Sequence, residues 1–106
     1  MIEVELLIPA DARSEAVVKV IEQVCFANEL TCALRGTLAS YPGCVHWHYK
    51  KDRQKGTLEI TWWDVEKRLW FKVAKGRTGE WIEDTLPKLK EEIEGNLRGL
   101  KDLGGL

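Results

Sequence analysis

Residues 44–74 read CVHWHYKKDRQKGTLEITWWDVEKRLWFKVA, and their pattern is the strongest indication of how the chain folds. It contains three runs, 44–50, 57–63 and 68–74, that are rich in aromatic and β-branched residues and alternate in polarity, as strands do. A polar loop over 51–56 and a short turn over 64–67 separate them. Strands joined by such short connections pair antiparallel. The stretch therefore predicts a three-stranded antiparallel meander.

On the N-terminal side of the meander, residues 32–39 predict a preceding strand, joined to it by a turn over 40–43, and residues 2–8 predict the first strand. Apolar residues at helical spacing predict one helix between the first two strands and another from residue 80. The expected class is α+β, in the order β-α-β-β-β-β-α, with a single mainly antiparallel sheet and two helices packed on one face. The first strand can pair with the second or lie at the far edge beside the fifth, and the sequence leaves both placements open.

The length of 106 residues suits one domain, residues 1–106. Glycines at 95, 99, 104 and 105 lead us to expect that residues 95–106 form a frayed tail. The chain has no apolar run long enough for a membrane span, and its start does not resemble a signal peptide. Three cysteines without a CxxC pair favour reduced thiols in the cytosol and argue against a structural zinc site of the usual kind.

Charge is distributed unevenly along the chain although its net value is only −1. Residues 1–49 carry three basic and six acidic side chains, residues 50–77 carry nine and four, and residues 78–106 carry four and seven. The weak net charge argues against a polyanion-binding domain as a whole. The middle of the chain is nevertheless basic.

Because side chains alternate across a strand, each predicted strand contributes to two faces. One face is almost wholly apolar and is expected to lie under both helices, with Gly36 opposite Trp47. The other face is polar and aromatic, and Trp63 beside Arg68 is expected to make a cation–π contact there. If the shortest loops set the register, its cross-strand rows are Arg35, His48, Glu59 and Lys72; Thr37, His46, Thr61 and Trp70; and Ala39, Cys44, Trp63 and Arg68.

With both helices on the apolar side, the polar face is expected to be open, and two exposed tryptophans on a sheet face are typical of a contact surface. We therefore predict a non-enzymatic cytosolic domain that forms a homodimer or binds a protein partner through this face. No metal and no cofactor is assigned, and a small ligand is a further option. The predicted binding residues are Arg35, His46, His48, Glu59, Thr61, Trp63, Arg68, Trp70 and Lys72.

Two alternatives use the same region of the chain. His46, His48 and Glu59 carry the imidazole and carboxylate groups of zinc and iron sites, and they would equally suit a small metal-dependent or acid–base enzyme. Basic residues interleaved with Trp63 and Trp70 are typical of single-stranded nucleic-acid binding. An isoelectric point of about 6.1 and the absence of an RNP-type motif argue against this last alternative.

Overall fold

The computed structural model describes residues 2–102, with side chains described up to residue 99. In chain order the elements are β1 (Ile2–Leu6), α1 (Ser14–Ala27), β2 (Thr31–Leu38), β3 (Tyr41–Lys50), β4 (Leu58–Trp63), the 3₁₀ turn η1 (Asp64–Glu66), β5 (Arg68–Val73) and α2 (Glu80–Asp102). The predicted order of strands and helices is confirmed.

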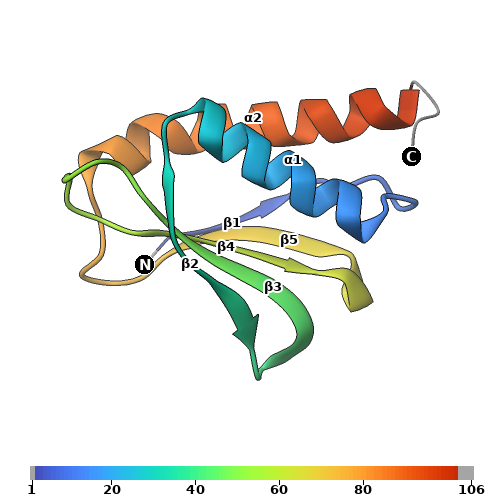
Figure 1. Cartoon of the computed structure of the whole chain (residues 1–106), viewed down its shortest axis with the longest axis horizontal. Helices are drawn as coiled ribbons and strands as arrows, with labels where there is room; N and C mark the ends of the chain where they lie inside the picture. The colour runs from blue at the N-terminus through green and yellow to red at the C-terminus, as the bar shows by residue number, and fades with distance from the viewer. Residues whose placement is uncertain (1, 103–106) are drawn as a thin grey trace.

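The five strands form one antiparallel sheet in the order β1-β5-β4-β3-β2. β1 pairs with β5, with Ile2 opposite Val73 and Leu6 opposite Leu69, which settles the placement that the sequence left open. α1 then carries the chain from one edge of the sheet to the other. Both helices lie on the same side of the sheet (Figure 1), so the predicted fold class is confirmed. We call this side the covered face and the opposite side the uncovered face.

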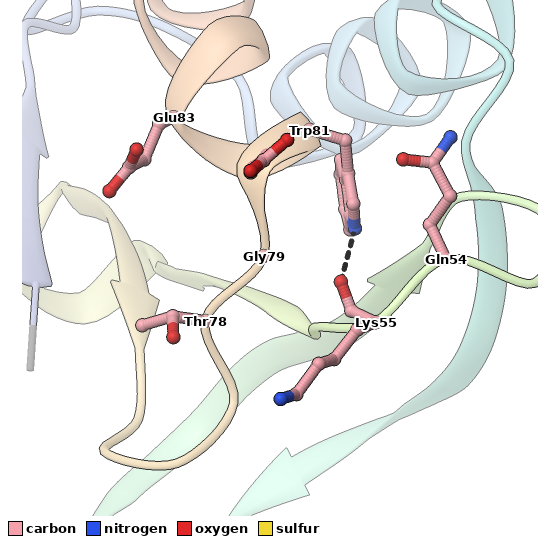
Figure 2. A pocket seen from close by; sticks show the side chains of 7 residues that line it. Gln54, Lys55, Thr78, Gly79, Trp81 and Glu83 are labelled. Carbon is pink, nitrogen blue, oxygen red and sulfur yellow. Dashed lines mark hydrogen bonds between the residues drawn. The ribbon is translucent and has the colours of Figure 1, made fainter.

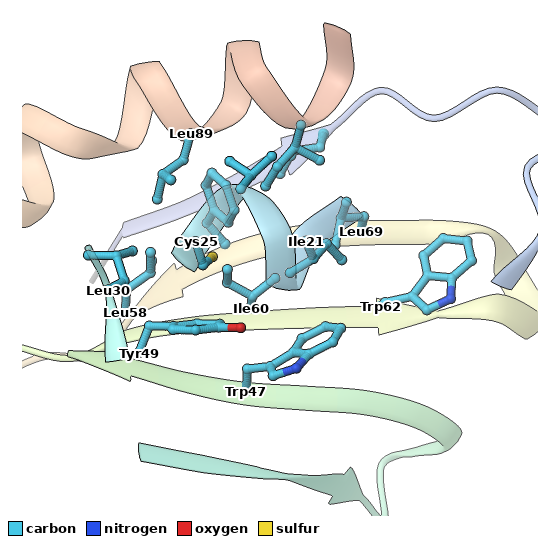
Figure 3. Packing of buried hydrophobic residues seen from close by; sticks show 14 of the residues in the cluster. Ile21, Cys25, Leu30, Trp47, Tyr49, Leu58, Ile60, Trp62, Leu69 and Leu89 are labelled. Carbon is cyan, nitrogen blue, oxygen red and sulfur yellow. The ribbon is translucent and has the colours of Figure 1, made fainter. Parts of the chain in front are cut away.

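The main core lies between the covered face and the helices. Trp47, Ile60 and Phe71 form one cross-strand row, and each side chain is fully buried. Figure 3 shows Trp47, Ile60 and their neighbours pointing toward α1 and α2. The indole N–H of Trp47 donates to Glu22 of α1 at 3.0 Å, and the indole N–H of Trp62 donates to Ser14 at 2.8 Å. The polar ends of these large rings are thus satisfied at the rim of the core.

Each helix packs by one apolar stripe. In α1 the buried stripe is Val17, Val20, Ile21, Val24 and Cys25, and in α2 it includes Ile82, Leu86, Leu89, Ile93 and Leu97. α2 continues to Asp102, into the segment 95–106 for which the sequence predicts a frayed tail, and residues 103–106 lie outside the described part of the chain. Burial of Ile93 and Leu97 offsets the roughly 1 kcal/mol that each nearby glycine costs a helix. Neither helix, as far as it is described, has the length and apolar content needed to cross a bilayer.

The β2–β3 hairpin departs from the predicted register. Its turn occupies residues 39–40, not 40–43, and pairing opens with Leu38 opposite Tyr41. Register shifts between Gly36 and Leu38 and between Cys32 and Leu34 then place Gly36 opposite His46, not Trp47. Since a slip of one residue sends every side chain to the other face, the predicted phase of this strand is wrong.

Candidate metal centre

The uncovered face carries most of the predicted site. The pairings of His46 with Thr61, His48 with Glu59, Glu59 with Lys72, Thr61 with Trp70 and Trp63 with Arg68 are all as predicted. β1 adds Glu3 opposite Lys72 and Glu5 opposite Trp70. β2 contributes Leu34 opposite His48 in place of the predicted Arg35.

Arg35 does not belong to this site. It lies opposite Trp47, which points to the covered face, and its guanidinium contacts Glu22 of α1 at 2.8 Å. The prediction that Arg35 shares a row with His48 is therefore wrong, and the cause is the bulged register of β2.

Much of the uncovered face is buried although no helix covers it. Figure 1 shows the tip of the β2–β3 hairpin on the side of the sheet away from the helices. There the Tyr41 ring packs edge-on against both Trp63 and Trp70, with ring centroids 5.1 and 5.0 Å apart. Arg68 lies over Trp70 at 4.5 Å and also bonds to Glu5. Aromatic and cation–π contacts therefore close one end of this face.

These contacts correct two expectations. Trp70 is only 4% exposed, so the prediction of two open tryptophans is wrong for Trp70, although Trp63 is partly exposed. Arg68 makes its cation–π contact with Trp70, not with Trp63, whose indole N–H donates to the Pro42 carbonyl at 3.0 Å. Sequence reasoning missed Tyr41 because its Tyr-Pro-Gly context is typical of a turn.

Three groups converge at the other end of the uncovered face, and we call them the triad: His46, His48 and Glu59. The His46 Nε2 atom lies 3.1 Å from His48 Nε2 and 3.5 Å from Glu59 Oε1, and His48 Nε2 lies 4.0 Å from Glu59 Oε1. The circumcentre of a triangle with these sides lies about 2.1 Å from each corner. Zinc binds histidine nitrogen and carboxylate oxygen at about 2.0–2.2 Å. The spacing of the three atoms is thus within the range of the ligands of a single ion.

Thr61 holds the orientation of the His46 ring. The Nδ1 atom of His46 lies 2.8 Å from the Thr61 hydroxyl, in a buried contact. Burial first, and the neighbouring His48 second, lower the pKa of His46 below its ordinary value, so the ring is neutral at pH 7. With its proton on Nδ1, the ring donates to Thr61 and turns the Nε2 lone pair toward the centre of the triad. An outer partner of this kind is usual behind metal-binding histidines.

The triad is reachable from solvent. Side-chain exposure rises from 6% for His46 to 14% for Glu59 and 23% for His48. Cys44 lies outside the triad, because its thiol accepts the Leu38 N–H at 3.3 Å and lies 3.6 Å from the Thr37 hydroxyl. The cluster of possible ligands is therefore His46, His48 and Glu59, without a sulfur atom.

A separate pocket of about 500 Å³ lies where the β3–β4 loop meets the start of α2 (Figure 2). Its lining includes Gln54, Lys55, Thr78 and Glu83, and the Trp81 indole N–H donates to the Lys55 carbonyl at 2.9 Å. No triad residue lines it. The pocket joins a loop to a helix and is not the recess that an enzyme built on the triad would need.

The chain matches no protein-family model, no curated protein and no solved structure. Function must therefore be inferred from the geometry of the triad and from its surroundings.

Proposed function

We propose that this domain binds one divalent transition-metal ion, with zinc as the best fit, through His46 Nε2, His48 Nε2 and a Glu59 carboxylate oxygen. The observation that carries the proposal is the spacing of these three atoms around a point about 2.1 Å from each. Imidazole and carboxylate are ligands that zinc and iron(II) accept. We thus prefer metal binding over partner binding, although the sequence alone favoured partner binding.

The distances at Glu59 support a metal over a purely hydrogen-bonded cluster. The contact between the two Nε2 atoms, 3.1 Å, is good hydrogen-bond geometry, with one ring donating. The contacts of Glu59 with the rings, 3.5 and 4.0 Å, exceed the 2.7–3.2 Å of a good hydrogen bond. The carboxylate thus approaches both rings without bonding well to either. An ion between them would satisfy all three groups.

Three protein ligands leave at least one coordination position open. In protein zinc sites this arrangement accompanies a bound water or an exogenous ligand, whereas structural sites use four protein ligands. The proposed metal centre is therefore accessible and not structural. The hydrophobic core, and not the metal, stabilises the sheet. An acid–base role of the same residues is the competing interpretation.

Metal titration tests the proposal directly. Protein expressed without a histidine tag and stripped with EDTA should bind one Co²⁺ or Zn²⁺ per chain, followed by absorption and by calorimetry. Zinc at about 100 times its dissociation constant should stabilise the fold by about 2.7 kcal/mol. For a domain of this size, that corresponds to a rise in melting temperature of about 10 °C.

Variants separate the site from unspecific binding. His48→Ala and Glu59→Gln should lose stoichiometric binding, because each removes one of three ligands. Glu66→Gln is the matched control, because this carboxylate lies exposed in η1. Absence of a cobalt absorption band, together with an unchanged melting temperature in zinc, would overturn the proposal and favour a hydrogen-bonded cluster.

Self-association through the uncovered face is a second candidate function. It is favoured by Leu34, which is 47% exposed beside the triad, and by the partial exposure of Trp63. Light scattering at high micromolar concentration should give the mass of a homodimer for the wild type and of a monomer for Leu34→Glu. Phe26→Glu on α1, also highly exposed, is the control and should leave the mass unchanged. A monomeric wild type removes this candidate.

We also propose a cytosolic location. Its support is that the three cysteines, Cys25, Cys32 and Cys44, are all free thiols. Free thiols are usual where glutathione and thioredoxin keep proteins reduced.

A further inference from the structure

Two loops bring five basic side chains to one end of the molecule. The β3–β4 loop carries Lys51, Arg53 and Lys55, and the β5–α2 loop carries Lys75 and Arg77. The Thr57 N–H donates to the Arg77 carbonyl at 2.9 Å, so the two loops lie side by side. All five are at least partly exposed, and in residues 2–99 none of them makes an ion pair. The loops themselves contain one acidic residue, Asp52.

This basic end is also the end of the sheet that holds the triad. His48 comes two residues before Lys50, the last residue of β3, and Glu59 is the second residue of β4. Lys72 is the cross-strand neighbour of Glu59 and the penultimate residue of β5. Lys50 shares the uncovered face with His48, and its ammonium donates to the Thr57 hydroxyl at 3.2 Å.

The charge around the open position favours an anion. A histidine that ligates a metal is uncharged, so two such ligands, one carboxylate and a divalent ion sum to +1, and Lys50 and Lys72 raise the local charge to +3. Glu3, opposite Lys72 on β1, reduces it by one. A positive centre with an open metal position and flanking ammonium groups suits the charged oxygens of a phosphate.

The aromatic residues argue for recognition of phosphate over recognition of bases. Trp70 is 4% exposed, with Arg68 over its ring and Tyr41 against its edge. Trp63 also packs against Tyr41. Single-strand binders need free aromatic faces on which bases stack. On this sheet the aromatic rings pack against one another.

We propose that the open position of the metal centre receives a phosphate oxygen, with Lys50 and Lys72 beside it and the two basic loops drawing the anion in. The inference rests on the proposed metal function and names the class of ligand for that site. The ligand is a phosphate-bearing molecule, recognised through its phosphate group. Free phosphate compounds and the phosphodiester backbone of a nucleic acid share this chemistry.

The test uses the full-length protein loaded with Co²⁺ at low ionic strength. Inorganic phosphate and a short single-stranded oligothymidylate are titrated separately, and the cobalt absorption bands report entry of an oxygen ligand. The double variant K50Q/K72Q should raise the dissociation constant for phosphate about tenfold, since two nearby positive charges are removed. Lysines on the helices provide the control, so K19Q/K88Q should bind phosphate like the wild type.

The outcomes separate the two proposals. A band shift with phosphate supports a small phosphate compound, and a shift with oligothymidylate alone supports a phosphodiester chain. Normal cobalt binding without a shift from either probe overturns the phosphate inference and leaves the metal proposal standing. Wild-type phosphate affinity in K50Q/K72Q also overturns it. Failure to bind cobalt at all removes both proposals.

Discussion

Phe71 and Trp70 are neighbours on β5, yet they are buried on opposite faces and by different means. Phe71 lies fully buried on the covered face, among aliphatic side chains that two helices bring down onto the sheet. Trp70 lies on the uncovered face, where Tyr41 and Arg68 cover it and Thr61 is its cross-strand neighbour. One face buries apolar area, and the other buries polar and aromatic groups that contact one another.

The difference assigns separate tasks to the two faces. Apolar burial is the dominant source of folding free energy and does not depend on direction. Buried polar groups contribute little net stability but fix orientation, provided that each has a partner. Within the described side chains, no buried side-chain nitrogen or oxygen lacks a hydrogen-bond partner. We therefore infer that the covered face provides most of the folding free energy and that contacts on the uncovered face fix the orientation of the triad.

Truncation of a core side chain on the covered face should destabilise the fold most. Phe71→Ala should lower the free energy of unfolding by about 3–5 kcal/mol, because it removes a fully buried ring and leaves a cavity. Urea unfolding at 25 °C measures this loss, and cobalt titration of the folded protein should still give one ion per chain. A loss below about 1 kcal/mol, the range of a surface substitution, would contradict the division between the two faces.

Thr61→Val should affect both stability and metal binding. It leaves His46 Nδ1 buried without its partner, which should cost about 1–3 kcal/mol in unfolding free energy. It should also weaken Co²⁺ binding about tenfold, because the outer contact no longer orients the ring. Thr37→Val, at an exposed position on β2, is the control. Unchanged cobalt affinity in the Thr61 variant would show that this contact does not position the histidine.

Glu94 makes a polar contact between α2 and the segment that follows β1. Its carboxylate accepts the Leu7 N–H at 2.8 Å and contacts Lys90 at 2.7 Å. Burial alone would raise the pKa of Glu94, but these two partners outweigh it and the pKa is lowered. Glu94→Gln should therefore cost about 1–2 kcal/mol at pH 7, as measured by urea unfolding.

The sign of the pH dependence follows from this lowered pKa. A carboxyl with a lower pKa in the folded state contributes stability above its unfolded pKa of about 4.3 and loses it as pH falls through the folded value. The stability gap between the wild type and Glu94→Gln should accordingly narrow below about pH 4. A gap that is constant from pH 7 to pH 3 would show that ionisation of Glu94 does not matter.

Arg35→Gln should have the smallest effect. Its ion pair with Glu22 is solvent-exposed, with both side chains more than a third exposed, so the loss should be under about 0.5 kcal/mol. Cobalt binding should be unaltered, because Arg35 lies away from the triad. Loss of cobalt binding would instead favour the register that the sequence predicted for β2.

The sequence predicted the phase of β3, β4 and β5 because alternation there is strong and the connecting loops are short. The pairing of His48 with Glu59 followed directly from it. β2 was predicted in the wrong phase, since Gly36 carries no side chain to mark a face and the two register shifts have no clear sequence signal. Closure of the uncovered face by Tyr41 depends on a bend of the hairpin, which is a tertiary effect that local patterns do not encode.

The fold also restricts position 79 to glycine. A Cβ atom built on Gly79 would collide with the Lys55 carbonyl. Only a residue without a side chain therefore allows the backbone of the β3–β4 loop to contact the backbone at the start of α2. Their backbones are consequently fixed relative to each other when the chain folds. The basic loops are then ordered when the chain folds. If the proposed anion binds there, it does not bear the entropy cost of ordering them, which is the advantage of a preorganised receptor.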